Sequence, residues 1–166
     1  RPAMKHAIFR LLLRFSSTRA GGLLFVFLLS PLDRWLLTKS SGRLSIAGLG
    51  APTLLLTTIG RKTGINRATP LLYLKDSATP VILYVIGSSG GQAQPPAWFL
   101  NLQHNSNVTV TRDGIAAPYK ASTVHGPQQT ELWRQFTQFN PGFTQYQNRV
   151  KRTIPIIKLT PLDRQP

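Results

Sequence analysis

The densest cluster of chemically active side chains is a short turn bracketed by two glycines. The turn reads Gly60-Arg61-Lys62-Thr63-Gly64 and is followed by Arg67, so three cations and a hydroxyl fall within eight residues. Glycines leave backbone amides open and the cations supply charge-assisted donors, a combination that suits a phosphate or a polycarboxylate. The order differs from the P-loop, in which the second glycine precedes the Lys-Thr pair. The alternative interpretation is a solvated basic hairpin tip.

A second glycine-rich stretch, Gly87-Ser88-Ser89-Gly90-Gly91, follows a predicted strand. Such a loop lets a planar ligand approach the backbone closely, and the Ser88 hydroxyl can form a hydrogen bond. Trp98 can stack on an aromatic ring system, and Tyr146 can donate a proton to a substrate that is being reduced. Each feature also has a structural interpretation: a flexible connection, a core tryptophan and a packed tyrosine.

The composition excludes several kinds of catalytic site. The 166 residues include 20 Lys and Arg against five Asp and Glu, a net charge of +15, and no cysteine. Two-carboxylate glycosidases, magnesium sites, thiol nucleophiles, zinc ribbons and iron–sulfur clusters therefore lack their ligands. The three histidines are isolated, so we expect no metal site, and neither a Ser-His-Asp constellation nor a nucleophile elbow is present. Redox or transfer chemistry would have to be carried by a bound cofactor.

Hydrophobic alternation and turn residues predict one antiparallel β domain into which helices are inserted late. Asp113-Gly114 is a strong hairpin signal, and Asn140-Pro141 ends the clearest helix. The predicted strands are 54–59, 67–75, 81–86, 107–112, 115–124 and 154–159; the predicted helices are 95–102, 128–139 and a short one that holds Phe143, Tyr146 and Val150. This order indicates the α+β class, with an antiparallel sheet or a small barrel.

The N-terminal 43 residues are basic and are interrupted by a short apolar run. Eight Lys and Arg face Asp33 alone, and the run 23–29 is shorter than the roughly 20 residues that cross a bilayer. Three interpretations stay open: a cleaved signal peptide, a helix packed on the domain, and an interfacial helix on an anionic membrane surface. A nucleic-acid partner is not favoured, because no recognition motif accompanies the charge. We divide the chain into a helical extension, residues 1–45, and a domain, residues 46–162.

Four motifs in order resemble the deazaflavin-dependent nitroreductase and quinone reductase family, whose members use reduced coenzyme F420. They are the segment 57–71, the loop 88–91, the segment 96–102, and Tyr146 ahead of Arg152-Thr153-Ile154-Pro155. The first of them contains the turn Gly60–Gly64, which we call the cationic turn. The resemblance implies a single-domain antiparallel split β-barrel over residues 46–162, related to FMN-binding proteins, with flanking helices and an N-terminal helical extension.

The resemblance also implies roles for individual residues. The cationic turn would hold the phosphate and acidic tail of F420, the following strand and the glycine-rich loop would line the deazaflavin, and the next helix would cover the channel. Tyr146 and Ser88 are the implied catalytic residues. The implied cofactor-binding residues are Arg61, Lys62, Thr63, Arg67, Pro70, Leu71, Leu72, Ile86, Gly87, Ser88, Ser89, Ala97, Trp98, Phe99, Leu100, Asn101 and Phe143.

Two places depart from the family pattern. Ser89 stands where many members carry a lysine, and Asn140-Pro141-Gly142-Phe143 replaces part of a tyrosine-rich segment of which Tyr146 is retained.

The expected function is hydride transfer from F420 to a small organic acceptor: a quinone, a nitro compound or an enone. The alternatives are an FMN-dependent reductase on the same barrel and a non-enzymatic basic module that binds membranes or nucleic acid. The expected location is the cytoplasm, with peripheral attachment at the inner membrane face, and a homodimer is compatible with the fold.

Overall fold

The computed structural model describes residues 52–162. The predicted helical extension, residues 1–45, and the first six positions of the predicted domain lie outside the described residues. Within residues 52–162, no helix combines the length and the apolar character that crossing a membrane requires.

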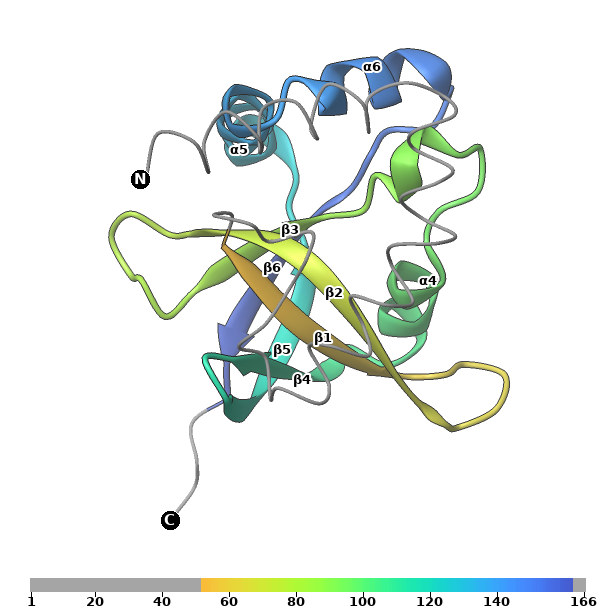
Figure 1. Cartoon of the computed structure of the whole chain (residues 1–166), viewed down its shortest axis with the longest axis vertical. Helices are drawn as coiled ribbons and strands as arrows, with labels where there is room; N and C mark the ends of the chain where they lie inside the picture. Colours follow the sequence, from red (N-terminus) through yellow and green to blue (C-terminus); the bar gives the residue numbers. More distant parts are fainter. Residues whose placement is uncertain (1–51, 163–166) are drawn as a thin grey trace, which may run out of the picture.

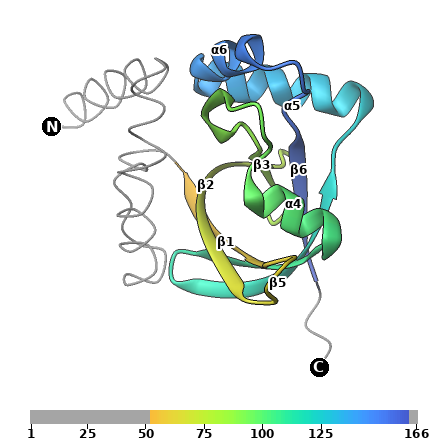
Figure 2. The same cartoon turned by 90° about the vertical axis from the view of Figure 1, so that its right-hand side faces the viewer.

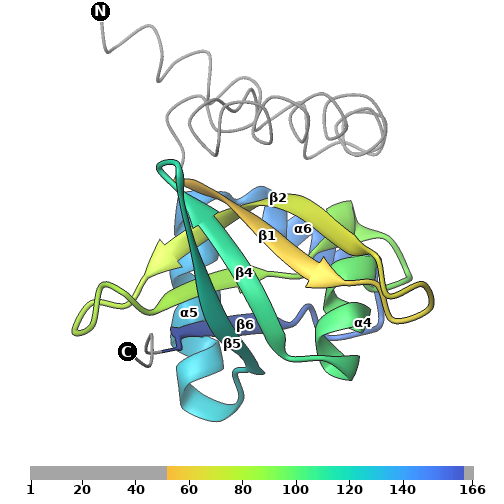
Figure 3. The same ribbon diagram turned by 90° about the horizontal axis from the view of Figure 1, so that it is seen from below.

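Six antiparallel strands close into a barrel in the spatial order β1-β2-β3-β6-β5-β4 (Figures 1 and 3). The strands are β1 (Thr53–Ile59), β2 (Asn66–Lys75), β3 (Leu83–Ile86), β4 (Asn107–Arg112), β5 (Ile115–Thr123) and β6 (Ile156–Pro161). β1 pairs with β2 on one side and with β4 on the other, where Leu55 lies opposite Thr111. This last pairing closes the sheet, and closure removes the free strand edges on which other chains could pair.

The connections between strands carry the helices of the described region. These are the 3-10 helix η2 (Ser89–Gly91) and the α-helices α4 (Ala97–His104), α5 (Gly126–Phe139) and α6 (Gly142–Arg149). α4 lies in the concave side of the curved β1–β2 ribbon, and α5 and α6 lie together away from it (Figure 2). η2 packs against α6, so the loop after β3 lies between α6 and the start of α4.

The sequence predictions of α+β class, antiparallel barrel and element order are confirmed. The ends of the predicted strands and of the two bounded helices differ from the observed ends by at most two residues. The Asp113-Gly114 hairpin is also confirmed, since both residues have positive φ (52° and 82°), as a two-residue type I′ turn requires.

β3 is buried on both faces because it separates two hydrophobic clusters. Leu83 and Val85 point into the barrel and belong to the first cluster, the barrel cluster. α4 contributes Trp98, Phe99 and Leu102 to it. The alternate residues of β3, Tyr84 and Ile86, point outward and are covered by apolar side chains from α5 and α6. A strand has a side-chain period of two, so one short apolar run supplies both clusters. The helix-side cluster comprises Tyr84, Ile86, Val124, Leu132, Phe136, Phe143, Tyr146, Ile154 and Ile156.

Gly91, in the loop after β3, packs against Tyr146 of α6. We expect the replacement of Gly91 by alanine to destabilise the fold. Its φ is +75°, and an added Cβ would lie 3.0 Å from the Tyr146 Cα, which is backbone and cannot swing aside. Gly126 is the matched control, because its φ is +66° but open space surrounds the position of its Cβ. Gly126→Ala should lower the free energy of unfolding by about 1 kcal/mol, and Gly91→Ala by about 2–4 kcal/mol. Denaturant unfolding measures both; equal losses would show that the Tyr146 contact costs nothing.

Candidate functional site

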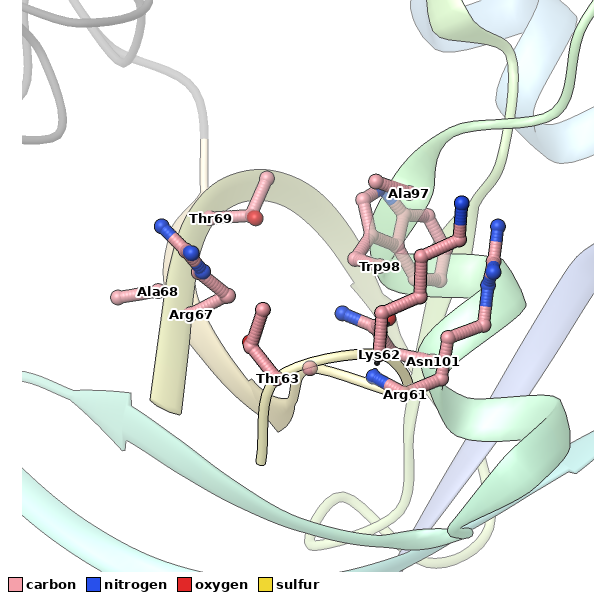
Figure 4. A pocket seen from close by; sticks show the side chains of 10 residues that line it. Arg61, Lys62, Thr63, Arg67, Ala68, Thr69, Ala97, Trp98 and Asn101 are labelled. Carbon is pink, nitrogen blue, oxygen red and sulfur yellow. Dashed lines mark hydrogen bonds between the residues drawn. The ribbon is translucent and has the colours of Figure 1, made fainter. Parts of the chain in front are cut away.

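A cavity of about 440 Å³ lies between the β1–β2 turn and the first half of α4. Figure 4 shows Arg61 and Lys62 beside Trp98 on one side, with Arg67 and Thr69 of β2 on the other. The cavity is thus built from one turn, the strand that follows it, and one helix. The lining residues are Gly60, Arg61, Lys62, Thr63, Arg67, Ala68, Thr69, Ala97, Trp98 and Asn101.

The shape of the turn depends on its two glycines. The Gly60 N–H donates to the Ile65 carbonyl at 2.9 Å, and the Gly64 N–H donates to the Gly60 carbonyl at 2.7 Å. A Cβ on Gly60 would lie 2.8 Å from Thr63 Oγ1 and 3.0 Å from the Ile65 carbonyl oxygen, so only glycine fits there. Gly64 has φ +67°, which favours glycine for conformational reasons. The glycines close the neck of the turn and leave residues 61–67 exposed.

The positive charge of the cavity is not neutralised by the carboxylates of the described region. Residues 52–162 contain three acidic side chains, and none of them lines the cavity. Asp76 accepts a hydrogen bond from the Tyr84 hydroxyl at 2.7 Å, which is the largest cause of its lowered pKa. Glu131 accepts from Arg134, and this pairing lowers its pKa to about 2. Asp113 Oδ2 lies 3.6 Å from Arg112 Nε. Arg61, Lys62 and Arg67 therefore present their charges to solvent, or to a ligand.

The loop after β3 is the second group of predicted site residues, and Arg152 holds it. The Arg152 guanidinium donates to the carbonyls of Gly87 (3.3 Å), Ser88 (3.0 Å) and Gln92 (3.2 and 3.3 Å). Burial lowers the pKa of Arg152. Ser89, Gly90 and Gly91 are consecutive residues with positive φ. Such a backbone is costly, and these contacts keep it in one conformation.

Seven of the predicted residues line the cavity: Arg61, Lys62, Thr63, Arg67, Ala97, Trp98 and Asn101. Gly87, Ser88 and Ser89 lie together in the loop held by Arg152. Tyr146 is buried on α6, with its backbone against Gly91. The loop and Tyr146 therefore meet each other, next to the segment that enters α4.

The other predicted residues lie away from the cavity wall. Phe99 and Leu100 pack in or against the barrel cluster, as does Leu71. Ile86 and Phe143 are in the helix-side cluster, and Leu72 packs against it. Pro70 is half-buried on β2 opposite Leu55. With the exception of Pro70, these side chains lie in or against the two hydrophobic clusters.

The predicted site residues did not include Thr58, Gly60, Ala68, Thr69 and Arg152, although Gly60 and Arg152 belong to motifs that the sequence analysis named. Gly60, Ala68 and Thr69 line the cavity, and strand alternation from Arg67 could have identified Thr69. Thr58 follows Leu54 and Leu56 at the inward positions of β1, where a polar residue marks the end of the apolar core. Arg152 stood in a family motif, but its role in holding the loop had no local signal, because its partners lie 60 to 65 residues earlier in the chain.

A closed antiparallel barrel with a helix in its concave side, and a cationic turn facing that helix, places the chain among the split-barrel proteins. More particularly, the chain belongs to the F420H(2)-dependent quinone reductase family, whose family model matches residues 32–161.

Individual relatives agree with this assignment. The chain is 35% identical over 127 residues to an F420H(2)-dependent quinone reductase of Mycobacterium tuberculosis, covering 73% of this chain and 82% of the relative. It resembles the solved F420-H2 dependent reductase FDR-A with a TM-score of 0.58 and 27% identity, over 65% of this chain and 93% of that one. A structure described as a domain-swapped dimer shares the fold, with a TM-score of 0.60 and 24% identity over 78% of this chain and 99% of that one.

Family membership decides between the function classes that the sequence left open. The protein is an oxidoreductase and its cofactor is coenzyme F420. The FMN-dependent reductase and the cofactor-free basic module, which were the alternatives, do not agree with this family.

Proposed function

We propose that the cavity binds the phosphate and acidic tail of coenzyme F420 and that the enzyme reduces a quinone. The observation that carries the proposal is that the turn and the start of β2 present Arg61, Lys62 and Arg67 into a cavity that none of the carboxylates of residues 52–162 lines. A ligand with a phosphate and γ-glutamyl carboxylates matches this set of donors in charge and in hydrogen-bonding type.

The remaining lining residues suit the part of the cofactor that continues from its charged tail. Trp98 is 5% exposed yet lines the cavity, so one part of its indole is available for contact with a ligand while the rest packs in the barrel cluster. Ala97 provides a small side chain at the start of α4, next to Trp98. This apolar wall beside a cationic turn suits a ligand with a charged end and a less polar body.

The loop 87–91 is the proposed place for the deazaflavin ring system. Its backbone is fixed by Arg152 from one side and by α6 from the other, so it offers a rigid surface. Rigidity matters because the reacting groups must be held in one orientation. When bound, the reduced cofactor supplies a hydride, and a quinone that accepts a hydride and one proton becomes a hydroquinone.

Tyr146 and Ser88 are the proposed proton donors, and water is the third source. Both residues belong to the region where the loop meets α6, with Ser88 half-buried and Tyr146 buried. A proton held at either hydroxyl can be given to the quinone oxygen as negative charge develops there.

Attachment to an anionic membrane and homodimer formation stay predictions. Vesicle co-sedimentation tests the first, and light scattering tests the second.

The acceptor is tested with three acceptor classes in parallel. Purified full-length protein and reduced F420 are mixed with a naphthoquinone, a nitroimidazole or a cyclic enone, and the absorbance of the oxidised deazaflavin is followed. We expect kcat/KM for the naphthoquinone to exceed the other two by at least about tenfold. The names of the relatives and of the family support this expectation. Faster turnover of the nitro compound or the enone would assign the acceptor to that class instead.

A further inference from the structure

We propose that Asn101 is a positioning residue that fixes the cationic turn against α4, and that it acts without binding the ligand through its side-chain amide. This inference rests on the proposed function of the cavity. It differs from the sequence-based expectation, in which Asn101 contacts the cofactor. The difference comes from the partners that the structure gives to both ends of the amide.

Each polar end of the Asn101 side chain makes one hydrogen bond inside the protein. Its Oδ1 accepts a hydrogen bond from the Arg61 backbone N–H at 3.1 Å, and its Nδ2 donates to Thr58 Oγ1 at 3.1 Å. Asn101 is 7% exposed, so these bonds are largely shielded from water. Buried amides that make such bonds are expensive to remove, because a partner is left unsatisfied.

Thr58 continues the connection to the far side of the turn. It is 1% exposed, and its Oγ1 donates to the Arg67 carbonyl at 3.5 Å, a long and weak bond. Asn101 and Thr58 thus connect α4 to Arg61, near the start of the turn, and to Arg67, just after it. The two residues lie 43 positions apart in sequence, so this link forms only when the barrel and α4 are assembled.

The hydrogen bonds within the turn close its neck, but they run between its own residues and do not fix the turn against α4. Residues 61–67 are exposed, and the three cations repel one another, since no acidic side chain of the described part of the chain lines the cavity. Ordering the turn before a ligand arrives lowers the entropic cost of binding. A neutral amide orders the turn without reducing its positive potential, whereas a carboxylate at the same place would cancel part of it.

A comparison of Asn101 with Thr58 separates positioning from direct contact. Thr58 is buried and does not line the cavity, so Thr58→Val can change ligand affinity only through Asn101 or the turn. We expect Thr58→Val and Asn101→Ala each to raise the F420 dissociation constant about tenfold, with Thr58→Ser close to the wild type. The KM for reduced F420 should rise in the same proportion while kcat stays within about twofold. Gln103→Ala, an exposed residue on the same helix, is the control and should change nothing.

A ligand-free measurement keeps this test independent of the proposed function. Hydrogen exchange of the Arg61 amide should become at least about tenfold faster in Asn101→Ala, because its acceptor is gone. Unchanged exchange, or normal F420 affinity in Thr58→Val alongside weak affinity in Asn101→Ala, would overturn the positioning role. If the wild type binds no F420, the proposed function fails, and the exchange of the Arg61 amide still decides the role of Asn101.

Discussion

Reversing two charges of the cavity, Lys62→Glu in the turn and Arg67→Glu at the start of β2, should weaken F420 binding by a factor of at least about 100. Each charge-assisted hydrogen bond contributes about 1.5–3 kcal/mol, so losing two corresponds to 3–6 kcal/mol, and repulsion by the new carboxylates adds to it. Solvent screening at this exposed turn holds the effect toward the lower end. A fluorescence titration with oxidised F420 measures the change, and wild-type affinity should itself fall as salt is raised.

The control for this variant has the same change in net charge at another place. Lys75→Glu with Lys120→Glu reverses two exposed lysines on β2 and β5, and neither lines the cavity. Its F420 affinity should stay within about threefold of the wild type, since distant exposed charges are largely screened. An equal loss in both double variants would mean that overall charge, and not the turn, governs binding.

Replacing Arg152 with methionine should reduce turnover by at least about 100-fold and should also destabilise the fold. The carbonyls of Gly87, Ser88 and Gln92 would lose their shared donor, and the positive-φ backbone between them would be free to relax. We expect a loss of about 3 kcal/mol in unfolding free energy, from hydrogen bonds to a charged, half-buried donor. Misplacement of the loop should lower kcat more than it weakens binding of the F420 tail at the distant cationic turn.

Two further variants make the Arg152 prediction specific. Arg152→Lys keeps the charge but lacks the planar fork, so it should recover only part of the activity. Lys151→Met removes a neighbouring exposed charge and should leave kcat unchanged. If Arg152→Met retains wild-type turnover at a temperature where it is folded, the loop does not position the reacting groups.

Local patterns carried enough information to predict the elements of this fold. The strand 67–75, the Asp113-Gly114 hairpin and the helix ended by Asn140-Pro141 each depend on residues close together in sequence. Barrel closure depends on β1 meeting β4, where Leu55 lies opposite Thr111, and nothing local specifies that register. The family resemblance supplied the closed barrel that the alternation alone left open.

In the candidate site, too, features within one segment could be predicted from the sequence, and contacts between distant segments could not. The cations of the turn occupy one segment, so their convergence on a cavity could be anticipated. The roles of Asn101 and Arg152 depend on hydrogen bonds that span 40 to 65 residues, which no local pattern reveals. Ile86 and Phe143 were expected beside the cofactor; both side chains lie in the helix-side cluster, and their contact with the cofactor stays a prediction.

The most direct measurement is a fluorescence titration of the purified full-length protein with oxidised coenzyme F420, with FMN titrated in parallel. We expect saturable binding of F420 at micromolar concentration, no saturable binding of FMN, and loss of the F420 signal in the variant with Lys62→Glu and Arg67→Glu. Binding of FMN alone, binding of neither, or F420 binding that survives reversal of both charges would show that the cationic turn and Arg67 do not hold this cofactor.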